Sequence, residues 1–270
     1  MGKAVMITSF KGGVGKSTVA VNLAAGLSRR KYKTLIVDLD ISSSSVGLLM
    51  GCEGNNIYNF CDVLLQRAAL SDAVISDSVD TTDGCLDIIN APFSYDSYDI
   101  SDAIFERFIE TAKAAYDFII FDTPPGKFEF FDILSKKADL VLVITLHSVV
   151  SIRAAEKLSL FLSENDVKNV RLIINCFNSE GIVKGTHFGI VDIIEYLKIK
   201  LIGIIEYNKQ FQILQEKGMT AYDMKQKKME SFFSDIIDRM LDNSIKLNTK
   251  YNGLKTTKLY FKKKTKNQDK

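Results

Sequence analysis

The chain has no uninterrupted apolar stretch of the roughly 18 residues that a membrane-spanning helix needs. Its N-terminus also lacks the basic, apolar and small-residue regions of a secretory signal peptide. The 4 cysteines show no C-x-x-C spacing, which argues against a zinc or iron–sulfur site and against a disulfide framework. We therefore expect a reduced, cytoplasmic protein with buried thiols.

Proline is scarce too, and this bears on the number of domains. The chain contains only 3 prolines and no interior linker rich in serine or glycine. Of its 270 residues 46% are hydrophobic and 25% charged, so the chain can bury a substantial core. We expect one large α/β domain over residues 1–245, followed by a lysine-rich tail over residues 246–270.

The stretch Lys11–Thr18, Lys-Gly-Gly-Val-Gly-Lys-Ser-Thr, has the features of a phosphate-binding loop. It follows the apolar run Ala4–Ile7 and precedes an amphipathic pattern from Val19, which predicts a strand, a glycine loop and a helix. Backbone N–H groups in such a loop turn toward phosphate oxygens, and the helix N-terminus adds partial positive charge. Lys16 is placed to reach the β- and γ-phosphates, and the Ser17 hydroxyl to ligate Mg²⁺. The other loop residues expected to bind the nucleotide are Lys11, Gly12, Gly13, Val14, Gly15 and Thr18.

The loop departs from the ordinary pattern at its start. Phe10 occupies the position of the usual first glycine, and a second lysine, Lys11, opens the loop. Lys11 lies too far round the loop to duplicate Lys16 on the same phosphates, so its natural use is to reach a nucleotide bound by a facing subunit. In these residues the chain resembles the MinD/ParA family of deviant Walker A ATPases, and Lys11 stands at the position of the family's additional lysine.

Apolar runs typical of strands alternate with helical patterns such as Ile104–Ala115, Ile152–Leu162 and Ile190–Leu197. This alternation predicts a doubly wound, mostly parallel sheet with helices on both faces. The resemblance implies the same architecture, a P-loop NTPase of the deviant Walker A (SIMIBI) type. The predicted strands after the first are Leu35–Val37, Leu86–Ile89, Phe118–Phe121, Leu140–Ile144, Val170–Ile174 and Leu201–Ile205.

Two predicted strands end in aspartates, at the edge of the sheet where ligands bind. Leu35–Asp40 ends with Asp38 and Asp40, and Phe118–Gly126 contains Asp122 before a Pro-Pro-Gly turn. A buried carboxylate needs a cation or several N–H donors, so these positions suit a metal site, whereas the alternative is a solvated turn. In the family, the residue matching Asp122 holds Mg²⁺ through water and the one matching Asp40 orients the attacking water. We expect Asp38 to lie nearer the metal and to assist.

The resemblance is closest to MinD-type members and covers roughly residues 1–240. Asn175 matches an adenine-contacting asparagine of the family, although an ordinary turn is the alternative. Asn208 stands where an aspartate is common, and Glu206 replaces a proline that frames the adenine. We expect Asn175 and Asn208 to contact the nucleotide. Further positions that look like those of MinD-type sequences are Leu49–Glu53, Tyr58–Phe60, Ser151–Arg153 and Ile193–Gly203.

The surfaces that meet effector proteins in the family differ in this chain. Leu146–Ser148 stands where MinD-like sequences have Asn-Pro-Glu, and Ala154 where an aspartate usually follows the arginine. The effector partners therefore stay unidentified at this level. His147 and His187 have no paired acidic motif, so we expect structural or surface roles for both.

The net charge of +2 conceals an asymmetry between the body and the tail. Residues 246–270 carry nine lysines and one acidic residue, for a charge of +8, so the remaining 245 residues sum to −6. Leu247, Tyr251, Leu254 and Phe261 fall near one helical face, interrupted by Lys258. Such a segment suits the surface of an anionic membrane. The alternatives are a solvated lysine tail that binds nothing and a contact with nucleic acid.

Together, the loop and the resemblance imply a slow, dimer-dependent ATPase with ATP and Mg²⁺ as cofactors. Its expected role is to position cellular machinery, as in MinD-like division-site selection, with reversible attachment to the inner face of the cell membrane. The main alternative is a ParA- or FlhG-type regulator of DNA partitioning or flagellar placement, for which DNA would be the partner. A metabolic amidoligase or reductase would need a substrate domain or cluster cysteines, and the sequence has neither.

Overall fold

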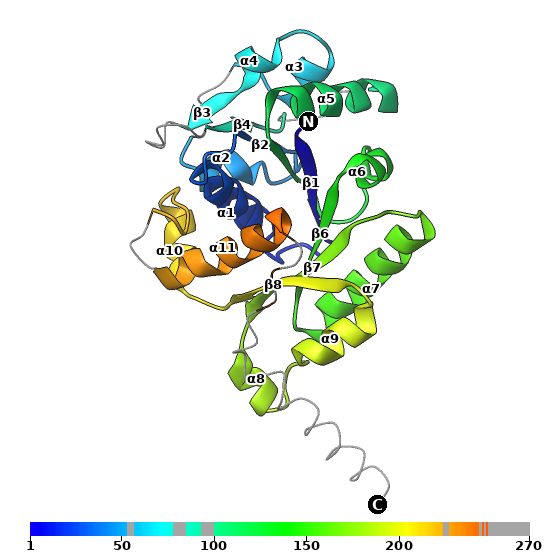
Figure 1. Ribbon diagram of the computed structural model, residues 1–270, viewed down its shortest axis with the longest axis vertical. Coiled ribbons are helices and arrows are strands. Elements are labelled where there is room, and N and C mark those ends of the chain that lie inside the picture. The colour runs from blue at the N-terminus through cyan, green and yellow to red at the C-terminus, as the bar shows by residue number, and fades with distance from the viewer. Residues whose placement is uncertain are drawn as a thin grey trace, which may run out of the picture.

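The computed structural model describes residues 1–52, 57–77, 85–92, 100–223, 227–242, 245 and 247. Its centre is an 8-stranded sheet with the order β3-β4-β2-β5-β1-β6-β7-β8 (Figure 1). The edge strand β3 is antiparallel to β4, and the other pairings are parallel, which confirms the predicted sheet. The strands are β1 (Lys3–Thr8), β2 (Thr34–Asp38), β3 (Ile75–Asp77), β4 (Leu86–Ile89), β5 (Phe118–Asp122), β6 (Leu140–Leu146), β7 (Val170–Phe177) and β8 (Lys200–Glu206).

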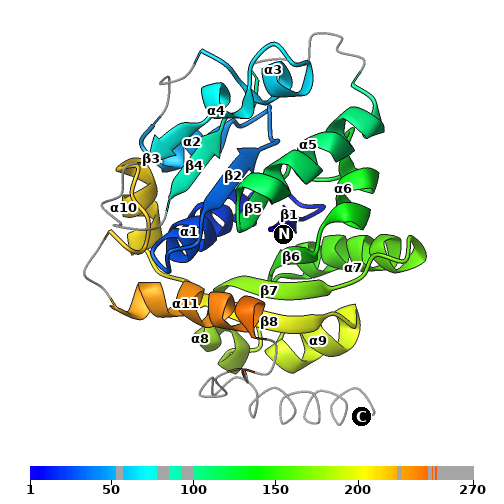
Figure 2. The same ribbon diagram turned by 45° about the horizontal axis from the view of Figure 1, so that its top comes forward.

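Helices cover both faces of the sheet (Figures 1 and 2). One face packs against α1 (Lys16–Ser28), α2 (Ser45–Leu49), α10 (Gln210–Glu216) and α11 (Lys227–Leu241). The opposite face packs against α3 (Phe60–Leu64), α5 (Asp102–Ala115), α6 (Phe131–Lys137), α7 (Val149–Glu164), α8 (Ser179–Val183) and α9 (Ile190–Leu197), and α4 (Leu70–Ala73) leads into β3. Within the described ranges, no helix is both long and apolar enough to cross a bilayer.

The central strands read as continuous apolar runs because each is buried on both sides. In β5, Ile119 and Phe121 join the core under α5, α6 and α7, whereas Phe118 and Ile120 join the core under α1 and α11. Successive side chains of a strand point to opposite faces, so one apolar segment serves two cores.

The strand order places the ends of β1, β2 and β5 side by side. In the parallel register Asp122 of β5 pairs with Asp38 of β2 on one side and with Ile7 of β1 on the other. Backbone and side-chain bonds continue beyond the strands, from Leu39 N–H to the Asp122 carbonyl at 2.8 Å and from the Thr123 hydroxyl to the Ile7 carbonyl at 2.9 Å. The loop after β1 therefore opens beside the aspartates of β2 and β5.

Candidate functional site

The glycine loop between β1 and α1 has a backbone that glycine alone adopts easily. Gly13 and Gly15 have φ values of +70° and +88°, in the left-handed region. A Cβ atom on Gly15 would also collide with the side-chain amide of Asn175. No side chain caps the N-terminus of α1, and its first turn contains no acidic residue. The first N–H groups of α1 are therefore left for an anion.

The two lysines of the loop have different surroundings. Lys16 is 6% exposed and makes no ion pair within 4.0 Å among the described residues. Lys11 is half-buried, and its ammonium turns back to the carbonyl of Gly12 at 3.4 Å. In the single chain, therefore, Lys16 is directed into the protein at the start of α1, whereas Lys11 stays on the outer side of its own loop.

The three predicted aspartates lie together at the carboxyl edge of the sheet, and all three are buried. The oxygens of Asp38 accept hydrogen bonds from Asp40 N–H at 2.9 Å and Val46 N–H at 3.1 Å. Asp40 accepts a 2.5 Å hydrogen bond from the Ser42 hydroxyl. In contrast, neither carboxylate oxygen of Asp122 has a hydrogen-bond partner among the described residues. Asp122 is thus the least compensated acid of the group.

Burial raises the pKa of both Asp38 and Asp122 above the ordinary aspartate value, and the charge of a neighbouring aspartate raises each further. The Ser17 hydroxyl and the Lys16 ammonium are close enough to Asp122 to lower its pKa, but the effect of burial is larger. A buried carboxylate without donors is tolerated when a cation joins it. The site therefore has the donor set for a hard divalent cation next to Ser17.

No group of three or more His, Cys, Asp or Glu side chains in the described ranges has the arrangement of a complete metal site. In proteins, Mg²⁺ keeps several waters and takes one or two carboxylates together with substrate phosphates. The glycine loop, the free helix N-terminus and the orphaned Asp122 oxygens thus fit a phosphate chain with Mg²⁺ better than a metal ion bound by protein alone.

A cavity of about 240 Å³ lies beside the glycine loop, between α1 and the segment after β8. Asn175 and Asn208, the two residues outside the loop that we expect to contact the nucleotide, line this cavity. The Asn175 amide donates to the Val14 carbonyl at 2.8 Å, and its oxygen accepts from Cys176 N–H at 2.9 Å, so Asn175 braces the loop. Asn208 accepts from Gln210 N–H at 2.9 Å at the start of α10.

Several residues of this cavity were not predicted from the sequence. Tyr207 is 58% exposed at its rim, and Cys176 lies at a bulge with a φ of +51°. Gln215 of α10 donates to the hydroxyl of Thr18, which is 197 residues away in the chain. Nothing in the sequence marks such pairs, because the contact is created by the return of α10 to the start of α1.

Comparison with known proteins agrees with this geometry. The family model described as an AAA domain matches residues 2–175. The septum site-determining protein MinD of Bacillus subtilis is 29% identical over 206 residues, 76% of each chain. This chain belongs to the MinD/ParA-type ATPases. It is therefore an ATPase of the class that serves cell division and intracellular positioning.

Solved structures of MinD share the whole architecture of this MinD/ParA-type ATPase. In the MinC:MinD cell division protein complex of Aquifex aeolicus, the matching chain is 27% identical with a TM-score of 0.80, and the match covers 91% of this chain and 98% of that one. MinD from Pyrococcus horikoshii, solved with Mg-ADP, is 21% identical with a TM-score of 0.75 over 92% of this chain and 100% of that one, and it shows the shared fold.

The departure at Leu146–Ser148 has a structural consequence. His147 is 4% exposed, accepts from Asn178 N–H at 3.3 Å and packs against the ring of His187 at 4.3 Å between centroids. Burial, followed by the nearby His187, lowers the pKa of His147 to about 4. The histidine is thus a neutral part of the packing between β6 and α8, as the sequence led us to expect.

This burial predicts acid sensitivity. Below about pH 6.5 the unfolded chain binds a proton at residue 147, whereas the folded chain does so only near pH 4. Between about pH 6.5 and pH 4, His147 should therefore lower the free energy of unfolding by up to about 1.4 kcal/mol for each pH unit as the pH falls. His147→Gln keeps an acceptor for Asn178 without a charge, so urea unfolding from pH 7 to 4 should show a shallower decline. Equal slopes for variant and parent would contradict the assignment.

Proposed function

We propose that this chain is a Mg²⁺-ATP-dependent dimerising switch, which positions cellular machinery as in MinD-like division-site selection. The observation that carries the proposal is the opposite placement of the two loop lysines. Lys16 is buried beside the uncompensated Asp122, whereas Lys11 turns away to Gly12 on the outer side of the loop. Lys11 acts on the nucleotide of a facing subunit, so the catalytic site is completed by dimerisation.

Different residues of the chain bind the phosphates, the metal ion and the rest of the nucleotide. Lys16 and the N–H groups of Gly12–Gly15 face the phosphate oxygens. Ser17 and Asp122 would hold Mg²⁺, and Asp38 would assist from the adjacent strand. When bound, Mg²⁺ would offset negative charge on the phosphate oxygens. Thr18 and the cavity residues Asn175 and Asn208 enclose the rest of the nucleotide.

Asp40 positions the attacking water in this proposal. It is 5% exposed at the end of the segment that leaves β2, and its oxygen already accepts from Ser42. Because that hydrogen bond fixes the carboxylate, its remaining acceptor capacity can orient a water beyond the phosphates. Hydrolysis is slow, since the useful output of such a switch is the lifetime of the dimer.

The dimer would act at the inner face of the cell membrane, held there by the tail, and would recruit an effector protein. Residues 246–270 lie outside the described residues except for Leu247. Leu247 packs against the core on the face of the sheet that carries α5, α7 and α9, so the segment available to a membrane begins beyond it. The +8 charge of the tail supports attraction to anionic lipids.

Substitution of each loop lysine should remove a different property of the protein. Lys16→Ala removes the cation that faces the phosphates and should abolish ATP binding in calorimetry. Lys11→Ala should keep ATP binding by the monomer but lose dimerisation in light scattering, together with turnover. Lys168→Ala, which removes an exposed charge elsewhere, should change neither property. Normal ATPase activity of Lys11→Ala would refute the role assigned to Lys11.

Asp40→Ala should trap the dimer. Because Asp40 acts on water rather than on the phosphates, the variant should bind ATP, dimerise and hydrolyse about a hundredfold more slowly or worse. Single-turnover ATPase assays and light scattering on one sample separate the two effects. Loss of Mg²⁺-ATP binding would instead identify Asp40 as a metal-site or structural residue.

Vesicle attachment should require both ATP and the tail. One tail is a weak anchor, and two tails on one dimer add their binding free energies. Replacing Leu254 and Phe261 by Asp should abolish co-sedimentation with anionic vesicles while dimerisation persists. Ile213→Asp, at an apolar position 45% exposed on the body, is the matched control. Equal sedimentation with ATP and ADP would contradict the switch, and salt-sensitive DNA binding by a tailless chain would favour a ParA-type role.

A further inference from the structure

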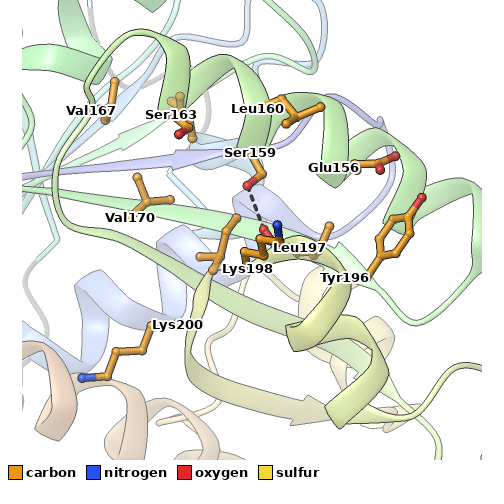
Figure 3. A pocket seen from close by; sticks show the side chains of 12 residues that line it. Glu156, Ser159, Leu160, Ser163, Val167, Val170, Tyr196, Leu197, Lys198 and Lys200 are labelled. Carbon is orange, nitrogen blue, oxygen red and sulfur yellow. Dashed lines mark hydrogen bonds between the residues drawn. The ribbon is translucent and has the colours of Figure 1, made fainter.

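An apolar groove lies between α7 and α9, outside the nucleotide site. A cavity of about 570 Å³ opens at the N-terminal end of α7 and is lined by Val149, Phe188, Ile193 and Tyr196. A second hollow of about 630 Å³ continues past Tyr196 along α7 (Figure 3). Val149 is 67% exposed and Tyr196 is 48% exposed. We call the first cavity, with its rim, the α7/α9 groove.

The groove is preformed and acidic at its rim. Two hydrogen bonds tie the helices together, from Arg153 to the Tyr196 hydroxyl at 2.8 Å and from the Ser159 hydroxyl to the Leu197 carbonyl at 2.9 Å. Arg153 also pairs with Glu156 at 2.6 Å, so its charge is already matched. The carboxylates of Asp192 and Glu195 make no ion pair among the described residues. A basic segment with apolar side chains would complement such a rim.

The end of the described chain leads to this side of the molecule. Helix α11 packs on the face of the sheet that carries α1 and ends at Leu241. Leu247, however, packs against the core of the opposite face, which contains Ile193 and Leu197 of α9. Leu241 and Leu247 therefore lie on opposite faces of the sheet, whose edge strand at this end is β8. The tail therefore begins on the same face as the groove.

The tail has the length and chemistry to reach the groove. Beyond Leu247 it has 23 residues, among them eight lysines and one acid. As a helix these residues would span about 35 Å, more than the roughly 24 Å of the 16-residue α7. Leu254 and Phe261 supply apolar side chains, and the lysines match the acidic rim.

We propose that residues 248–270 dock in the α7/α9 groove of their own chain, with Leu254 and Phe261 in the cavity and lysines facing Asp192 and Glu195. A tail held there is withheld from any other surface, so docking opposes the membrane attachment proposed above. The contact is intramolecular and needs neither nucleotide nor lipid.

The absence of tryptophan from the sequence provides a direct probe. Phe261→Trp in the full-length, nucleotide-free chain, without lipid, should give a blue-shifted emission shielded from acrylamide. Adding Val149→Lys and Glu195→Lys should weaken docking, with roughly a two- to fivefold effect expected for the lost charge attraction alone. Val150→Lys and Glu164→Lys change exposed neighbours that do not line the groove, and they should leave the shielding unchanged. Circular dichroism verifies that each variant is folded.

Three results would overturn the proposal. The first is a tryptophan emission typical of full exposure in the chain that carries Phe261→Trp alone. The second is shielding that survives the groove changes, which would place the tail elsewhere. The third is shielding that rises with protein concentration, which would assign the docking to a second copy. Because no lipid is present, each result is independent of whether the tail binds membranes.

Discussion

The structure depends on holding Lys16, Asp38 and Asp122 out of water at one edge of a parallel sheet without fully compensating them. Burying a charge is expensive unless it is paired and hydrogen-bonded. Asp38 is partly compensated by two backbone N–H groups, whereas the Asp122 oxygens have no hydrogen-bond partner and Lys16 makes no ion pair within 4.0 Å among the described residues. Strand order produces this arrangement, since β2, β5 and β1 are neighbours. The site is therefore suited to an anion together with a cation.

Hydrogen bonds from neighbouring elements hold the glycine loop in place. The Asn175 amide holds the Val14 carbonyl, Gln215 holds the Thr18 hydroxyl, and the N–H of Gly126 bonds the Ser9 carbonyl at 3.0 Å. These bonds connect the loop to β7, to α10 and to the turn after β5. A preformed loop loses little entropy when phosphates bind, which is the advantage of preorganisation in binding and catalysis.

Much of this was accessible from the sequence, for a physical reason. Strands buried on both faces leave uninterrupted apolar runs, and a phosphate loop needs glycines at fixed positions, so β1, the loop and the aspartates after β2 and β5 were predicted in place. Contacts across long sequence separations were not, because no local pattern records them. Asn175 was expected to face the base, and the structure adds its bond to Val14, 161 residues away. The antiparallel β3 and the α7/α9 groove also depend on tertiary packing alone.

The central claim is that Lys11 completes the site of a facing subunit, and mixing two inactive variants tests it most directly. Lys11→Ala and Asp40→Ala subunits are combined in equal amounts at saturating Mg²⁺-ATP. In a mixed dimer, the site on the Lys11→Ala subunit keeps its own Asp40 and receives Lys11 from its partner. The mixture should recover ATPase activity, up to about a quarter of the parent rate if half of the dimers are mixed, because each mixed dimer has one complete site of two. No recovery, with mixed dimers shown to form, would place Lys11 on the phosphates of its own chain and contradict the account.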